Sequence, residues 1–360
     1  MKSNTLRVLI LNTLLTGLMV AGCHKPTDPD QVSKPVFSPA GGTYEGVVDV
    51  GLTTTTPGTT IRYTTDGSDP NTNSSVYYSP IHVTQATTLK AIAYGSGLQD
   101  SAIATASYTI TLEPSEMLFV HGGSFNPAFS YTVTLSSFYL GKYEVTQAEY
   151  QAVMGTNPSI SGGNPNRPVE MVSWFKAIEY CNRRSIMEDL SPCYSYLTYG
   201  TNPDNWPSGW NIDSYNATNI TCAWSANGYR LPTEMEWMFA AKGGNQSQGY
   251  TYSGSNYSYD VAWYFGNSGG RTHDVGEKAA NELGTFDMSG NVWEWCWDIY
   301  GDYPTGSYID PTGPDGGSSR VKRGGSWGNS ADGCTVRSRD YGGADGGSST
   351  NGFRVCMAMN

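Results

Sequence analysis

The chain has 360 residues, a length that suits two or three domains, and its 38% hydrophobic content is enough to fill their cores. The 43 glycines and a charged fraction of only 15% indicate many turns and few exposed helices. A formal net charge of −11 argues against nucleic acid or an anionic membrane surface as a partner, because both would repel the protein. A small neutral or basic ligand is easier to accommodate.

The N-terminus has the pattern of an export signal. Lys2 and Arg7 precede an apolar run over residues 8–20, which is too short and too interrupted for a durable membrane span. The run ends at Leu18-Met-Val-Ala-Gly-Cys23, which resembles a bacterial lipobox. We therefore predict a lipoprotein signal peptide over residues 1–22 and a lipidated, polar tether over residues 23–34, displayed at the outer-membrane surface. The alternative is an ordinary signal peptide in which Cys23 occurs by chance.

Residues 35–112 carry the signals of a small β-sandwich. Apolar and polar residues alternate, as in residues 88–94, and turn signals recur about every ten residues. The stretch Thr60-Ile-Arg-Tyr-Thr-Thr-Asp-Gly-Ser-Asp-Pro70 resembles the immunoglobulin-like module at the C-terminus of chitobiases and hexosaminidases. That resemblance implies a non-catalytic spacer.

Asp69, Asn71 and Asn73 have the spacing of the first half of an EF-hand loop. However, Ser74 stands where the loop needs Gly, and Pro80 stands where it needs Glu. We therefore predict a plain Asx-rich turn here and no calcium loop.

Residues 113–360 are rich in Trp and Gly and form the second predicted domain. Two of its helices begin at capping boxes, Thr146 with Glu149 and Thr233 with Glu236, and a third begins after Ser173. Long irregular loops fill the rest. The predicted helices cover residues 146–154, 174–184 and 233–241.

Six cysteines remain once Cys23 is set aside, and in an exported chain they favour disulfides, although the pairing cannot be predicted. They occur without any CxxC pair, so a zinc site is not expected. They are Cys181, Cys193, Cys222, Cys296, Cys334 and Cys356.

Five motifs in the second domain resemble, in content and order, the formylglycine-generating enzyme (sulfatase-modifying factor) family. The resemblance covers about residues 115–360 and implies an α+β fold, a variant of the C-type lectin fold with little regular structure. The motifs are Tyr143-Glu-Val-Thr146, Pro168-Val-Glu-Met-Val-Ser-Trp174, Gly228-Tyr-Arg-Leu-Pro-Thr-Glu-Met-Glu-Trp237, Asp287-Met-Ser-Gly-Asn-Val-Trp-Glu-Trp295, and Arg323-Gly-Gly-Ser-Trp327 with Gly352-Phe-Arg354.

Charged residues inside these motifs are predicted to be structural. Carboxylates and guanidinium groups set among tryptophans suit buried, charge-assisted pairs, which are more often scaffolding than chemistry. The residues are Arg230, Glu234, Glu236 and Glu294, among Trp237, Trp293 and Trp295.

The resemblance also bears on catalysis. The family's oxidases hold copper with two cysteines five residues apart, shortly after the Gly-Gly-Ser motif. The second falls on Cys334, but the first falls on Asn329. A single thiolate cannot provide a two-sulfur cuprous site, so we predict that the chain is not an enzyme and that Cys334 is half of a structural disulfide. The GxSxG match at Gly266–Gly270 lies in a glycine-rich loop and is interpreted as coincidence.

We expect the chain to require no cofactor, but the resemblance implies a structural calcium site. The positions that match the family's ligands are Asp287, Gly290, Val292 and Glu294. Two carboxylates with two backbone carbonyls would give calcium hard oxygen ligands. In the alternative, Asp287 caps a turn and Glu294 pairs with an arginine.

The terminal stretch over residues 328–351 contains only Gly, Asn, Ser, Ala, Asp, Cys, Thr, Val, Arg and Tyr. Lys, Glu, Gln, Met and Trp are absent, and these are the residues whose codons cannot end in a pyrimidine. This pattern resembles the adenine-directed variable region of diversity-generating retroelement proteins of the Treponema variable protein type. The alternative is a static Gly/Ser/Asp-rich loop.

We therefore predict a surface lipoprotein whose terminal stretch binds a protein or glycan ligand on a host or neighbouring cell. The alternatives are a formylglycine-generating oxidase and a static carbohydrate-binding adhesin. Tyr341 is the strongest candidate contact, because tyrosine is a rigid amphipathic anchor. The predicted ligand-binding residues are Gly328, Asn329, Ser330, Asp332, Gly333, Ser338, Asp340, Tyr341, Gly342, Gly343, Asp345, Gly346, Ser348, Ser349 and Thr350.

Overall fold

The computed structural model describes residues 31–45, 48–83, 86–111, 117–128 and 130–359. The predicted signal peptide, the predicted lipidation site Cys23 and most of the predicted tether lie outside these ranges. Within the described ranges, no helix combines the length and the hydropathy needed to cross a membrane.

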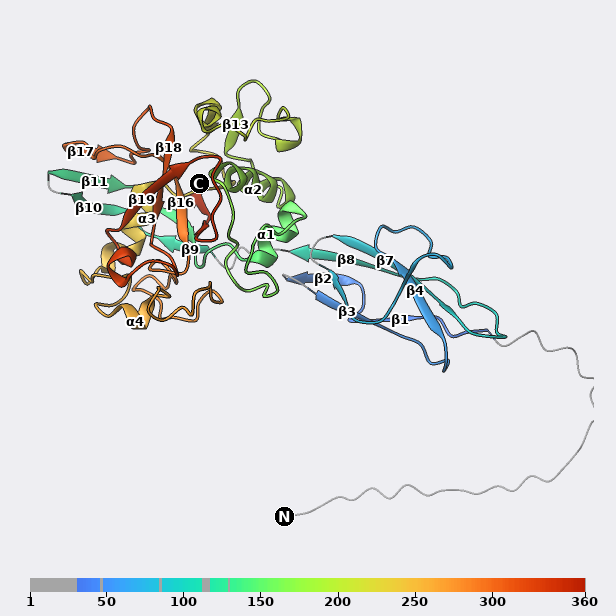
Figure 1. The fold of residues 1–360 in the computed structure, drawn as a ribbon. Helices are drawn as coiled ribbons and strands as arrows, with labels where there is room; N and C mark the ends of the chain where they lie inside the picture. Colours follow the sequence, from blue (N-terminus) through green and yellow to red (C-terminus); the bar gives the residue numbers. More distant parts are fainter. Residues whose placement is uncertain (1–30, 46–47, 84–85, 112–116, 129, 360) are drawn as a thin grey trace, which may run out of the picture.

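The N-terminal module consists of strands in two sheets (Figure 1). One sheet has the order β1-β3-β6 and the other β2-β8-β7-β4-β5. Leu89, Ala91 and Ala93 alternate with half-buried residues along β7 and are fully buried, which places one face of that strand in the core. The strands are β1 (Val36–Ser38), β2 (Gly42–Glu45), β3 (Val48–Thr53), β4 (Thr60–Thr64), β5 (Ser75–Val76), β6 (Ile81–Val83), β7 (Thr87–Tyr94) and β8 (Ala104–Thr111).

The predicted Asx turn is confirmed. The backbone N–H of Asn73 donates to Asn71 Oδ1 at 2.8 Å, and Asp69 forms an ion pair with Lys90 at 2.7 Å. Asp69 is therefore already paired with a cation.

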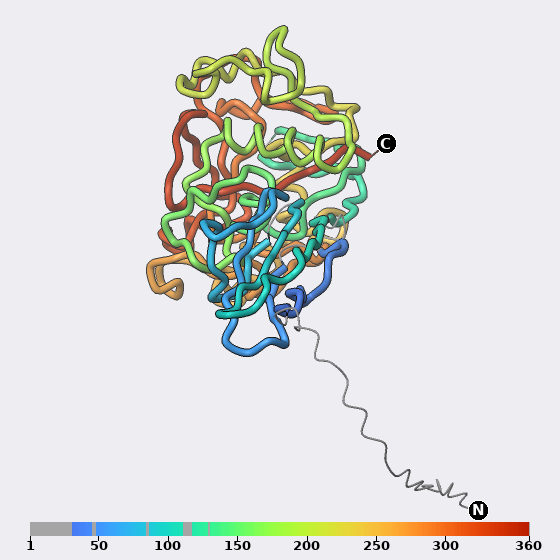
Figure 2. The backbone as a smooth tube through the Cα atoms, turned by 90° about the vertical axis from the view of Figure 1, so that its right-hand side faces the viewer, coloured from blue at the N-terminus to red at the C-terminus, as the bar shows by residue number. Residues whose placement is uncertain are grey.

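Among its described residues, the second domain has four small sheets, with the orders β15-β21-β12-β9, β19-β18-β16-β20, β10-β11-β17 and β13-β14. Figure 2 follows the last residues, in red, across the domain to the C-terminus. Its strands are β9 (Met117–Val120), β10 (Gly123–Ala128), β11 (Tyr131–Leu135), β12 (Phe138–Gly141), β13 (Tyr194–Tyr196), β14 (Ile220–Cys222), β15 (Tyr229–Arg230), β16 (Trp293–Ile299), β17 (Gly306–Ile309), β18 (Ser319–Arg323), β19 (Arg339–Gly343), β20 (Asn351–Gly352) and β21 (Cys356–Ala358).

The three predicted helices are confirmed. Thr146 and Thr233 each accept a hydrogen bond at 3.2 Å from the backbone N–H three residues on, so both capping boxes form. The helices are α1 (Gln147–Met154), α2 (Trp174–Met187), α3 (Glu234–Ala241) and the unpredicted short α4 (Ser258–Val261), with 3₁₀ turns η2 (Pro203–Asn205), η3 (Ser214–Asn219), η4 (Gly244–Gln246) and η5 (Ala331–Cys334).

The expected disulfides are not present among the described residues, and this prediction is wrong for the six cysteines from Cys181 onward. All six are free thiols, and all except the half-buried Cys222 are buried. They fill core positions as small apolar side chains, a common role for buried cysteine.

Candidate functional site

A buried ion pair joins Glu294 on β16 to Arg354, which follows β20. Arg354 Nε and Nη2 each lie 2.6 Å from a carboxylate oxygen of Glu294, and neither side chain is exposed. Trp237 Nε1 donates to the same carboxylate at 2.7 Å. Arg354 also donates to the carbonyl oxygens of Gly141 and Phe286, both at 2.9 Å. The pair therefore ties the residues after the terminal stretch to α3, β12 and β16.

A second buried carboxylate, that of Glu234 at the start of α3, forms ion pairs with two arginines. Arg323 lies 2.6 Å from it, and Arg339 binds both of its oxygens, at 2.6 and 2.7 Å. Burial alone would raise the pKa of Glu234, but the positive charges of Arg323 and Arg339 lower it below its ordinary value. Arg339 belongs to the terminal stretch, so this carboxylate anchors the stretch in its middle.

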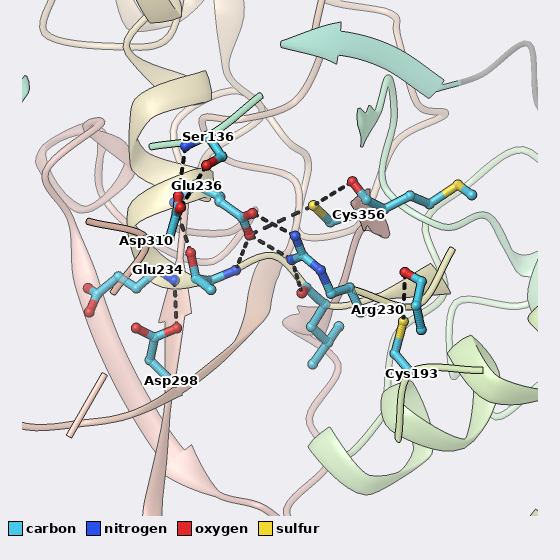
Figure 3. Close-up of polar contacts among 12 residues, drawn as sticks. Ser136, Cys193, Arg230, Glu234, Glu236, Asp298, Asp310 and Cys356 are labelled. Carbon is cyan, nitrogen blue, oxygen red and sulfur yellow. Dashed lines mark hydrogen bonds and ion pairs between the residues drawn. The ribbon is translucent and has the colours of Figure 1, made fainter. Parts of the chain in front are cut away.

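The third pair joins Arg230 to Glu236 through two hydrogen bonds of 2.7 and 2.6 Å (Figure 3). Arg230 is only 4% exposed. The prediction that the charged residues of the motifs form buried structural pairs is confirmed for Arg230, Glu234, Glu236 and Glu294.

We call these three groups of buried ion pairs, around Glu294, Glu234 and Glu236, the frame. The terminal stretch begins and ends next to residues of this frame. It runs through η5 and the edge strand β19, and the N–H of Trp327 Nε1 donates to the carbonyl of Ser349 at 2.9 Å, which draws its two ends together. Cys334, Val336 and Ala344 point into the core. The stretch is therefore held at its ends and at a few buried side chains.

The predicted ligand-binding residues divide into two groups. The exposed ones are Gly328, Ser330, Asp332, Tyr341, Asp345 and Gly346. The half-buried ones are Asn329, Gly333, Ser338, Asp340, Gly342, Gly343, Ser348, Ser349 and Thr350.

Several side chains of the predicted ligand-binding set make polar contacts within the protein. Asn329 Oδ1 accepts from the Ser326 hydroxyl at 2.6 Å, Ser338 Oγ donates to a backbone carbonyl, and Asp340 pairs with Lys322 at 2.9 Å. At the exposed Asp345, Oδ1 accepts from the Ser214 hydroxyl. Asn329, Ser338 and Asp340 are half-buried and partly structural, because changing them would leave polar partners unsatisfied, and their role in ligand binding stays a prediction.

Two aromatic residues next to the stretch, Tyr300 and Phe265, were not predicted from the sequence. Tyr341 is 53% exposed, and its ring centroid lies 4.4 Å from that of Tyr300. Phe265 is 73% exposed, and its backbone N–H donates to the carbonyl of Asn329 at 2.8 Å. Neither residue belongs to a motif, and only the three-dimensional arrangement brings them beside the stretch.

The two carboxylates of the predicted calcium site differ in how they are occupied in the structure. Both oxygens of Glu294 are committed to Arg354 and Trp237, and Val292 contributes its N–H to Glu144. Asp287 Oδ2 accepts from Gly276 N, and its buried Oδ1 has no partner. No group of three or more potential His, Cys, Asp or Glu ligands occurs in the described ranges. The calcium site stays a prediction that would require Glu294 to leave Arg354.

Cys334, which stands at the position of the family's second copper-binding cysteine, is fully buried. Cys334 lies at the end of η5 with no exposed surface, and burial raises the pKa of its thiol to about 12. A protonated thiol is a poor metal ligand. Asn329, at the position of the first cysteine, uses its side chain within the turn.

The first prediction concerns the Glu294–Arg354 pair. Arg354→Met should cost about 3 to 5 kcal/mol of unfolding free energy, because it strands a buried carboxylate. The double variant Arg354→Met/Glu294→Leu should recover part of that loss, since it removes both charges. Urea denaturation measures both, and a cost for Arg354→Met within about 0.5 kcal/mol of zero would contradict the structural role.

The second prediction concerns pH. Asp298 accepts from Glu234 N at 2.7 Å, and burial, with the nearby Glu234, raises its pKa to about 8 (Figure 3). The folded protein then holds a proton that the unfolded chain releases near about pH 4, so stability should fall as pH rises from about 5 to 8.5. Asp298→Asn should flatten this slope. Thermal melts across that range test it, and a wild-type stability that is constant or rises with pH would contradict it.

Comparisons with known proteins agree with this architecture. Residues 104–359 match the sulfatase-modifying factor enzyme 1-like domain, and residues 39–105 match the chitobiase/beta-hexosaminidase C-terminal domain. The solved structure of Treponema denticola variable protein 1 is similar with a TM-score of 0.60 and 36% identity, covering 74% of this chain and 98% of that one.

Two relatives align with different shares of this chain and of their own length. Chaperone protein LppX of Paenibacillus barcinonensis is 44% identical over 248 residues, which cover 63% of this chain and 83% of that protein. The formylglycine-generating enzyme of Streptomyces coelicolor is 35% identical over 132 residues, 32% of this chain and only 40% of the enzyme. The chain belongs to the sulfatase-modifying factor enzyme 1-like family.

Proposed function

We propose that this chain is a surface lipoprotein that binds a ligand, protein or glycan, through the exposed residues of the terminal stretch. The observation that carries the proposal is the contrast in burial along the last part of the chain. Arg323, Phe353 and Arg354 on either side are fully buried, whereas six of the predicted contact positions between them are exposed. Such exposed polar positions can change with little effect on folding.

The similarity to a solved variable protein supports diversification of the stretch. Its composition, free of Lys, Glu, Gln, Met and Trp, is what randomised codons ending in a pyrimidine would give. We propose the immunoglobulin-like module as the spacer that holds the binding domain away from the lipid anchor at Cys23.

A formylglycine-generating oxidase is the second candidate, because relatives bear that name. The same family also includes a mouse protein named an inactive formylglycine-generating enzyme, 34% identical over 160 residues. Asn329 at the position of the first cysteine, and the enclosed Cys334 with its raised pKa, support the inactive alternative for this chain.

The name of the Paenibacillus relative raises a chaperone function. A chaperone needs exposed apolar surface to hold unfolded chains. Within residues 328–351, all of them described, Tyr341 is the one exposed large apolar side chain. The terminal stretch therefore suits selective recognition better than general holding of unfolded proteins.

The third prediction compares two variants. Replacing Ser330, Asp332, Tyr341 and Asp345 together with other small residues should cost less than about 0.5 kcal/mol per position. All four are exposed, and the hydrogen bond from the Ser214 hydroxyl to Asp345 lies at the surface, where water can replace it. Trp293→Ala, at a buried position of β16, should cost about 3 to 5 kcal/mol through cavity formation. Chemical denaturation measures both.

The same variants are then screened against an array of host and bacterial surface proteins and glycans. The four-residue variant should lose or exchange the parent's ligands while remaining folded. If it unfolds, or binds every ligand that the parent binds, the terminal stretch is structural and the proposal is wrong.

The fourth prediction addresses catalysis. The purified protein, supplied with copper, should not convert cysteine to formylglycine in a sulfatase-derived peptide, because soft cuprous ion needs a thiolate pair. Peptide mass spectrometry gives the readout, with Asn329→Cys as the matched variant. Turnover by the unmodified chain would favour the oxidase.

A further inference from the structure

A cavity of about 390 Å³ with both apolar and polar lining lies in the second domain, and none of its lining residues belongs to the terminal stretch. Leu135, Phe138 and Met359 give it apolar walls, and Trp224 adds an aromatic one. Figure 3 draws four of its polar residues, Ser136, Arg230, Glu236 and Asp310. An apolar body with a few placed polar groups is the usual make-up of a small-molecule site.

The cavity offers a hydroxyl donor that the described residues leave unused. Arg230 spends both Nη atoms on Glu236 and on the carbonyl of Leu231, while its buried Nε has no partner among the described residues. Ser137 Oγ accepts from Gly122 N at 2.9 Å, which leaves its own proton free to donate. Arg230 Nε has almost no exposed surface of its own, so the Ser137 hydroxyl, which lines the cavity, is the donor that remains for a ligand.

The cavity also offers acceptors, with little net charge. Arg230 neutralises Glu236, so Asp310 at the exposed rim provides the remaining charge. Asp310 accepts from the backbone N–H and the hydroxyl of Ser136, both at 2.7 Å, and these bonds fix its carboxylate in place. An anionic ligand would meet this carboxylate and the overall charge of −11.

Trp224 extends the site into a second cavity. Trp224 and Thr312 line both the first cavity and a neighbouring one of about 220 Å³, which Trp297 also lines. The rings of Trp224 and Trp297 meet edge to face, with centroids 5.7 Å apart. Two cavities that share an aromatic wall can hold two consecutive ring-shaped units of one ligand.

We propose that these two cavities form a binding site for a neutral oligosaccharide of at least two pyranose units. Sugar hydroxyls both donate and accept hydrogen bonds, which matches the mixed groups of the site, and the apolar face of a pyranose ring packs against tryptophan. The site is separate from the terminal stretch and does not rest on the proposed function.

The experiment is a titration followed by saturation-transfer NMR and calorimetry. The probes are N,N′-diacetylchitobiose and cellobiose at concentrations up to about 10 mM, with glucuronic acid as the anionic control. The two disaccharides share the neutral ring and differ in the acetamido group, so they distinguish an N-acetylated glycan from a plain one. We expect at least one to bind and glucuronic acid not to bind.

Substitutions in the two cavities test whether the disaccharide binds there. Trp224→Ala should weaken affinity about tenfold, and Thr312→Val, which keeps the side-chain shape, about fivefold through one lost hydrogen bond. Tyr341→Ala, in the terminal stretch, should bind like the parent. Failure of both disaccharides to bind, unchanged affinity in Thr312→Val, or loss of binding in Tyr341→Ala would each overturn the proposal.

Discussion

Buried pairing between arginines and carboxylates is the constraint on which the second domain depends. Glu294 holds Arg354 after the terminal stretch, and Glu234 holds Arg323 before it and Arg339 within it. A domain with short strands and long loops has little continuous hydrogen-bonded structure to fix its ends. Charge-assisted, bidentate contacts supply that fixation with defined geometry, and breaking one of them leaves an uncompensated buried charge.

This arrangement separates the residues that fold the domain from those that remain available to a ligand. The frame fixes where the terminal stretch begins, turns and ends, while Ser330, Asp332, Tyr341 and Asp345 stay exposed. Arg339 shows that the separation does not follow the sequence, because a residue inside the stretch serves the frame. A diversified surface built this way would tolerate change at the exposed positions and resist it at Arg339, Cys334 and Val336.

The sequence predicted most of the fold because its signals are local or belong to dense motifs. The capping boxes at Thr146 and Thr233 mark helix starts through contacts three residues apart, and the alternation in β7 marks a half-buried strand. The candidate site was predicted less well. The partners of Asp340, the approach of Phe265 to Asn329 and the free state of the cysteines depend on residues brought together from distant segments, which no local pattern encodes.

The frame specifies the fold, and the exposed part of the stretch does not. The most direct measurement is a display library in which Ser330, Asp332, Tyr341 and Asp345 are randomised together, sorted for folded protein beside a matched library randomised at Arg323, Arg339, Glu294 and Arg354. We expect most members of the first library to display as folded protein and few members of the second to do so. Equal losses in the two libraries would contradict it.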